Sequence, residues 1–100
     1  GTKIIKYKAN GADVVIPSRC TEIGDRAFQS KTALETVVIP DGVKKIGECA
    51  FADCRLLKSI VIPDSVTTIG DEAFYYCALL EYAVIPDGVT TIGKRDENRE

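Results

Sequence analysis

Apolar residues recur along the chain with a fixed step of 23 positions. An Ile-Pro pair, an Ile-Gly pair, an Ala-Phe pair and a single leucine all keep this step. The Ile-Pro pairs lie at residues 16–17, 39–40, 62–63 and 85–86, and the leucines are Leu34, Leu57 and Leu80. Four markers in one phase, without an insertion or a deletion, predict a repeat protein. Its coils must stack, because a single coil cannot bury its own apolar face.

A short strand is expected just before each Ile-Pro pair. In the stretch from Leu34 to Ile39, alternation places Val37 and Ile39 on one face and Thr36 and Val38 on the other. The matching strands are expected at residues 14–16, 59–62 and 82–85. Proline then ends each strand because it lacks an N–H donor, and the Pro-Asp-Gly or Pro-Asp-Ser that follows makes a turn.

The rest of each coil has its own pattern. A second extended piece is expected at residues 66–69, and Gly70 permits the next bend. We expect Asp71 to cap a short helical turn over residues 72–76, which drives Phe74 into the core. The period and the L-x-x-V-x-I spacing predict an α/β leucine-rich-repeat solenoid, right-handed, with 23-residue coils. A parallel β-sheet would form one face and short helical turns the other.

The two ends depart from the repeat. Residues 1–93 are expected to form one domain and 94–100 a polar tail, too polar to seal a core. Asn10-Gly11, between extended runs, predicts a β-hairpin cap over residues 1–16. The repeats that follow are expected at 17–39, 40–62 and 63–85, with a partial repeat at 86–93. The chain is therefore expected to be either cut from a longer array or joined through its open end. There Val89 and Ile92 would make an end-to-end homodimer.

Composition narrows the classes of function. The chain has 13 Lys plus Arg against 15 Asp plus Glu, a net charge of −2, so no basic field exists to hold nucleic acid. No apolar run approaches the roughly 18 residues that span a bilayer, so no membrane insertion is expected. Histidine, the commonest general base and zinc ligand, is absent. We therefore expect no enzyme, no catalytic residue, no cofactor and no metal site.

Carboxylates form two rows at the repeat step, and these rows leave an alternative open. The rows are Asp41, Asp64 and Asp87 after the prolines, and Asp25, Glu48 and Asp71 after the glycines. Stacked acids could hold calcium, which takes six to eight oxygen ligands. Both rows also lie where a turn or a helix cap favours Asp, so a structural role is the preferred interpretation.

The four cysteines differ in their expected environments. Cys20 takes the place of a valine in the other coils and is expected to be buried. Cys49 aligns with charged residues, which predicts an outward, exposed and reactive thiol. Cys54 and Cys77 stack on adjacent coils, as a reduced, buried ladder or, alternatively, as a disulfide. A zinc site is disfavoured because Cys49-x4-Cys54 lacks a second pair of ligands.

The outward face of the expected concave sheet is the most informative surface. One row holds four valines, Val15, Val38, Val61 and Val84, and its neighbour holds Asp13, Thr36, Ser59 and Tyr82. Solvated strands usually carry polar residues at such positions. The valines have two explanations, plain strand propensity or an apolar binding stripe, and both stay open here.

One family resemblance rests on the run IPDGVKKIGECAFADCRLLKSIVIP. It resembles the BspA-like class of bacterial leucine-rich repeats, over roughly residues 11–93. Cys54 and Cys77 match the cysteine position of that class, and Lys31 departs from it in the first full coil. The resemblance implies a cell-surface or secreted protein that binds a protein, such as a host matrix or plasma protein. We expect an adhesion or interaction module that binds through the sheet. The alternative is a structural spacer or a self-assembling fragment of a larger surface protein.

Overall fold

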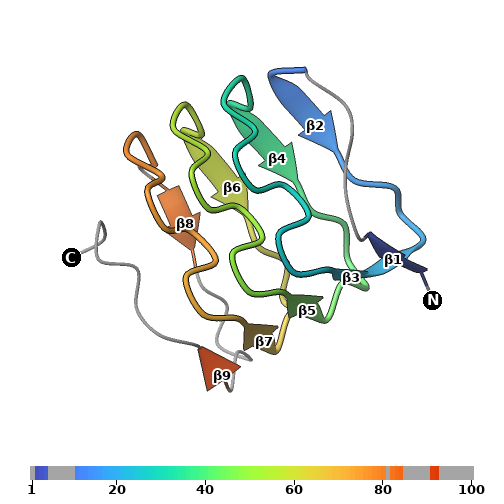
Figure 1. Ribbon diagram of the computed structural model, residues 1–100. Coiled ribbons are helices and arrows are strands. Elements are labelled where there is room, and N and C mark those ends of the chain that lie inside the picture. Colours follow the sequence, from blue (N-terminus) through green and yellow to red (C-terminus); the bar gives the residue numbers. More distant parts are fainter. Residues whose placement is uncertain (1, 5–10, 81, 85–90, 93–100) are drawn as a thin grey trace.

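The chain forms two parallel β-sheets that run along a stack of coils (Figure 1). The computed structural model describes residues 2–4, 11–80, 82–84 and 91–92, with side chains for residues 11–80. The four-stranded sheet has the order β2 (Asp13–Val15), β4 (Thr36–Val38), β6 (Ser59–Val61) and β8 (Tyr82–Val84). The five-stranded sheet has the order β1 (Thr2–Ile4), β3 (Cys20–Ile23), β5 (Lys45–Ile46), β7 (Thr68–Ile69) and β9 (Thr91–Ile92).

The register of both sheets follows the sequence repeat. Val38 pairs with Val61 in the four-stranded sheet, and Ile46 pairs with Ile69 in the five-stranded sheet, each pair 23 residues apart. The predicted solenoid with parallel strands is confirmed. Of the second extended piece predicted at residues 66–69, residues 68–69 form β7, which belongs to a second sheet that the sequence pattern had not revealed.

The core lies between the two sheets and the turn segments, and its central feature is a column of phenylalanines. The rings of Phe28 and Phe51 stack with centroids 5.0 Å apart, and those of Phe51 and Phe74 with centroids 5.7 Å apart. All three side chains are buried. Stacked aromatic pairs of this kind contribute roughly 0.5–1.5 kcal/mol each beyond the area that they bury. The column therefore ties three successive coils together.

No helix occurs in the part of the chain that the structure describes, so the helical turn expected over residues 72–76 is not found there. Instead, alternate N–H groups of the turn segment donate to the next coil: Arg26, Phe28 and Ser30 donate to the carbonyls of Glu48, Ala50 and Ala52. The N–H groups between them close turns within their own coil, as in Ala27 to Gly24. Glu72 and Tyr76 have positive φ angles of 56° and 61°, which no right-handed helix contains. The N–H groups that a helix would use for its own hydrogen bonds donate to the next coil instead.

The predicted N-terminal hairpin is wrong in the described residues. A hairpin would pair β1 with β2, but β1 pairs in parallel with β3, and β2 belongs to the other sheet. Gly11 also lacks the positive φ that the two-residue turn needs. The Asn-Gly signal reports only a local preference, whereas the edge of β3 offers a partner for a strand. Residues 2–4 therefore extend the five-stranded sheet.

Two glycines are required by close approach of neighbouring coils. A Cβ on Gly47 would lie 2.6 Å from the backbone nitrogen of Asp25, and one on Gly70 would lie 2.6 Å from that of Glu48. Neither glycine has a positive φ, so the bend predicted at Gly70 does not explain its identity. The absence of a side chain lets the backbones of adjacent coils touch at this corner.

Candidate functional site

Three valines stand outward from the four-stranded sheet and are aligned by its register. Val15, Val38 and Val61 are 69%, 50% and 67% exposed, while the residues on either side of each point into the core. The predicted alternation is therefore confirmed for β2, β4 and β6. Val84 pairs with Val61 through the backbone of β8, and its side chain lies outside the described residues. We call Val15, Val38 and Val61 the valine row.

The neighbouring outward row is polar and internally bonded. The Thr36 hydroxyl donates to a carboxylate oxygen of Asp13 over 2.8 Å, between β4 and β2. Ser59 is half-buried on β6, and Tyr82 pairs with it through the backbone, its side chain also lying outside the described residues. The structure thus brings the predicted binding residues together on one face.

A row of aspartates marks the corner where these strands end. Asp41 and Asp64 are exposed, each in a turn closed by a hydrogen bond from a valine N–H to the proline carbonyl, Val43 to Pro40 and Val66 to Pro63. Gly42 has a φ of 104°, which suits glycine. Among the described residues, neither carboxylate has a hydrogen bond or an ion pair. A hydrogen-bonding role in the turn therefore does not account for this row.

The other carboxylate row has a structural role at its first member. A carboxylate oxygen of Asp25 accepts the N–H of Glu48 over 2.8 Å, which binds one coil to the next. In the described part of the chain, no three His, Cys, Asp or Glu side chains are grouped so that they could hold a metal ion. The calcium alternative gains no support there.

Charges of opposite sign pair between neighbouring coils at three places in the described residues. The ion pairs are Glu22 with Lys45 at 3.9 Å, Glu35 with Lys58 at 3.7 Å and Arg26 with Glu48 at 3.9 Å. Exposed pairs of this kind contribute about 0–1 kcal/mol each. Asp41 and Asp64, like Asp25 and Glu48, are instead like charges one repeat apart.

Three cysteines are buried, as predicted. Cys20 packs in the core, and the thiols of Cys54 and Cys77 donate to the carbonyls of Phe28 and Phe51, both over 3.1 Å. None of the cysteines in the described residues forms a disulfide. Burial raises the pKa of Cys54 to about 11, so its thiolate, the reactive form, is scarce at neutral pH. The thiols of Cys54 and Cys77 thus join neighbouring coils.

The prediction that the Cys49 thiol is exposed is wrong, and its reactivity stays a prediction. The side chain is half-buried, and its sulfur lies 4.0 Å from a carboxylate oxygen of Glu72. Burial, and then the negative charge of Glu72, raise the pKa of this thiol. The alignment of Cys49 with Arg26 correctly indicated an outward direction. A long arginine side chain extends into water from such a position, whereas the short cysteine side chain stays close to the neighbouring coil.

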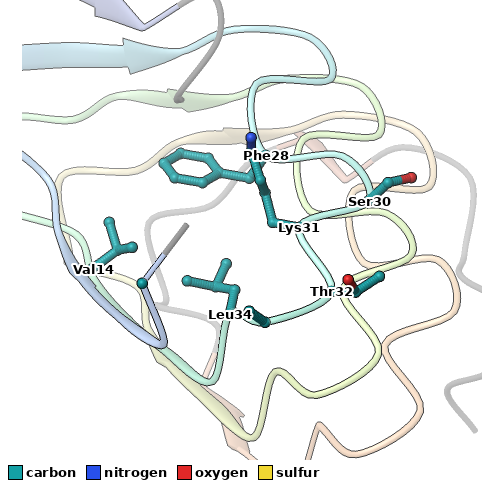
Figure 2. A pocket seen from close by; sticks show the side chains of 8 residues that line it. Val14, Phe28, Ser30, Lys31, Thr32 and Leu34 are labelled. Atoms are coloured by element: carbon teal, nitrogen blue, oxygen red, sulfur yellow. The ribbon is translucent and has the colours of Figure 1, made fainter. Parts of the chain in front are cut away.

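A hollow of about 300 Å³ lies beside the first turn segment (Figure 2). Val14, Phe28 and Leu34 surround it, and Ser30 and Thr32 lie at its rim. The three apolar side chains are at most 5% exposed, so they offer a ligand little apolar surface.

The first coil is shorter than the next. Ten positions separate Ile4 from Val14, against fourteen between their pairing partners, Ile23 and Val37. The first coil thus has four residues fewer between these two strands.

The structure adds an exposed apolar row that the sequence interpretation missed. Leu56 and Leu79 are 42% and 44% exposed, and each precedes a buried leucine, Leu57 or Leu80. The signal was the pair of consecutive leucines, since adjacent residues near a strand cannot both point inward. The predicted self-association residues remain untested. Val89 and the side chain of Ile92 lie outside the described residues, and the Ile92 backbone pairs with Ile69 in the five-stranded sheet.

No helix among the described residues is long and apolar enough to span a membrane. No protein with a curated description matches the chain. Among solved structures, the chain is similar to a leucine-rich repeat protein of T. pallidum, with 33% identity, a TM-score of 0.89, and coverage of 91% of this chain and 45% of that one. A Bacteroides ovatus leucine-rich repeat protein gives 47% identity, a TM-score of 0.76, and coverage of 81% and 21%. The pneumococcal vaccine antigen PcpA is 32% identical, with a TM-score of 0.88, and the match covers 92% of this chain and 23% of that one.

The chain thus spans less than half the length of each of these structures. The model of one family, described as the BspA type leucine rich repeat region, matches residues 2–96 in six copies. The architecture of the similar structures and the 23-residue phase of the sequence agree with this match. The chain belongs to the BspA type leucine-rich repeat proteins.

Proposed function

We propose that this chain is a protein-binding module that contacts its partner through the outward face of the four-stranded sheet. Leucine-rich repeats generally mediate protein–protein interaction or surface functions, which supports protein binding as the general function. The observation that supports binding through the four-stranded sheet is the valine row, three aligned β-branched side chains that are at least half exposed. Strand propensity favours valine at these positions, but burial against a partner is what makes an apolar surface row favourable in water.

Adhesion at a bacterial surface is the biological setting that we propose for this module. One similar solved structure is described as a leucine rich cell surface protein from Faecalibacterium prausnitzii, with 26% identity and a TM-score of 0.56. Another is a pneumococcal vaccine antigen. These descriptions concern those proteins, and they support a surface location for this chain only by similarity. Host matrix and plasma proteins are the partners to try first.

The test is a binding assay with a panel of purified matrix and plasma proteins. Val38→Arg with Val61→Arg places two charges on the valine row, and Leu56→Arg is the matched control at an exposed apolar position off this sheet. All variants should fold, because surface changes usually cost less than about 0.5 kcal/mol. Binding should fall at least tenfold in the valine variant only, since a desolvated charge would face an apolar surface. Equal binding by parent and valine variant would refute the proposal.

A structural spacer that assembles through its ends is the second candidate. It would place no demand on the valine row, and the valine variant would then behave like the parent in every assay. Ile92→Lys would instead turn a self-associating protein into a monomer, as measured by sedimentation. The backbone pairing of Ile92 with Ile69, which places β9 at one end of the five-stranded sheet, is the observation that favours testing this.

A further inference from the structure

We propose that the partner docks apolar side chains on the valine row and places lysine or arginine side chains over Asp41 and Asp64. This inference rests on the proposed function and names the chemistry of the partner. The valine row alone would accept any apolar surface. The charges next to it select among such surfaces.

The two aspartates lie within reach of the valine row. Asp41 is three residues after Val38, and Asp64 is three residues after Val61. Three residues span at most about 10 Å of chain, which is close to the distance over which charges act through physiological salt. A partner seated on the valine row would therefore feel both carboxylates.

The aspartates also lie directly above one another. The N–H of Gly42, next to Asp41, donates to the hydroxyl of Ser65, next to Asp64, over 3.0 Å. The corners of adjacent coils are therefore in contact, and the two backbones are about 5 Å apart, as in neighbouring strands. Two exposed carboxylates of like charge therefore leave neighbouring corners. A cation from a partner would pair with them without displacing any bond within the chain.

The chain does not supply that cation itself in the described residues. Within four positions of the valine row, the acidic residues are Asp13, Glu35, Asp41 and Asp64, and the basic residues are Arg19 and Lys58. Lys58 already pairs with Glu35 at 3.7 Å, and Arg19, on the corner of the coil before Asp41, forms no ion pair in the described residues. Lys44 lies beyond the corner, next to β5 of the five-stranded sheet. The surroundings of the valine row are thus acidic, with Asp41 and Asp64 left unpaired.

Two phage-displayed peptide libraries test the inference. Both carry four randomised apolar positions, flanked by Lys or Arg in one library and by Asp or Glu in the other. The parent chain should enrich the basic library at least tenfold over the acidic one, and 500 mM NaCl should weaken the selected peptides. Asp41→Asn with Asp64→Asn should reduce their affinity about 2- to 30-fold and remove most of the salt dependence. Neither carboxylate has a hydrogen bond or an ion pair in the described residues, so this variant should fold like the parent.

The outcomes separate the two proposals. If Val38→Arg with Val61→Arg abolishes peptide binding while the asparagine variant binds basic peptides like the parent, the charge inference falls and the valine face stands. If the acidic library is enriched equally, or neither library is enriched, the inference falls as well, and the panel of native proteins decides the proposed function. If the selected peptides bind the valine variant like the parent, both proposals fall.

Discussion

Replacing Gly47 by alanine should destabilise the protein, although the usual expectation has the opposite sign. Gly47 does not have a positive φ, and at such a position alanine normally stabilises by about 0.4–1 kcal/mol by restricting the unfolded chain. Here the new Cβ would lie 2.6 Å from the backbone nitrogen of Asp25 and 2.7 Å from the carbonyl carbon of Gly24. Both are backbone atoms, which cannot rotate away, so the coils themselves must separate.

The magnitude follows from the hydrogen bonds at this corner. An ordinary contact needs at least 3.4 Å, so the coils must move apart by about 0.8 Å, the difference between 3.4 and 2.6 Å. The N–H of Gly47 donates to Ile23 over 2.8 Å, and that of Glu48 donates to Asp25 over 2.8 Å. Both bonds would stretch beyond 3.5 Å and be lost. At about 0.5–1.5 kcal/mol for each of the two bonds, with about 1–3 kcal/mol for overpacking, the loss should be about 2–6 kcal/mol.

Urea denaturation followed by circular dichroism measures this loss, and two other glycines serve as controls. Gly11→Ala should be neutral or slightly stabilising, because the nearest atom to its Cβ is 3.9 Å away and its φ is not positive. Gly42→Ala should cost about 1 kcal/mol through its φ of 104° alone, since nothing lies within 4 Å. A Gly47→Ala protein as stable as the parent would show that the coils do not touch at this corner, and the account of the glycines would be wrong.

Three further predictions concern the core and the thiols. Phe51→Ala should cost about 3–5 kcal/mol in urea denaturation, because Phe51 stacks on both sides; a loss below 1 kcal/mol would contradict the column. Burial raises the pKa of Cys54 from 9.0 to about 11, so its contribution to stability is fully present below pH 9 and is lost as the pH rises to 11. Stability should therefore fall by about 3 kcal/mol over that window, a fall that Cys54→Ser should lack. Cys49 should react with a thiol reagent at pH 8 more slowly than free cysteine, because its pKa is raised, and Glu72→Gln should speed the reaction; an unchanged rate would exclude the influence of Glu72.

The sequence predicts the features of the fold that depend on repetition. The alternation in Leu34–Ile39 fixes which side chains of a strand point inward, and the structure buries Val37 and exposes Val38 accordingly. The phase of the markers also fixes the register, because residues one repeat apart have to lie side by side if identical coils stack. Alternation and phase together are therefore sufficient to locate the valine row.

The errors arise where contacts between coils override a local preference. Residues 72–76 have no proline to prevent a helix, but the N–H donors of the equivalent turn segments bind the neighbouring coil, and no single-coil pattern contains that information. The Asn-Gly hairpin failed for the same reason, since β3 was the available partner for β1. The burial of Cys49 depends on the adjacent Glu72, which lies in another coil. Each error reports a tertiary contact at a distance of about one repeat.

The same stacking indicates where a partner can act on this protein. Every coil places its polar groups beside the same groups of the next coil, so most of them must find their hydrogen-bond partners there. The thiol of Cys54 donates to the carbonyl of Phe28, and the carboxylate of Asp25 accepts the N–H of Glu48. A position that the next coil does not satisfy stays open along the whole stack. In the described residues, the valine row and the corner aspartates are open in this sense, one apolar and one charged, and both belong to the same strand ends. An interaction along them would gain from each coil in turn, so affinity should grow with the number of coils that present both rows. A variant that loses Val61 and Asp64 together should bind a selected peptide more weakly than a variant that loses either residue alone. A peptide whose affinity does not change when one of the two residues is lost would show that the two rows do not share that ligand.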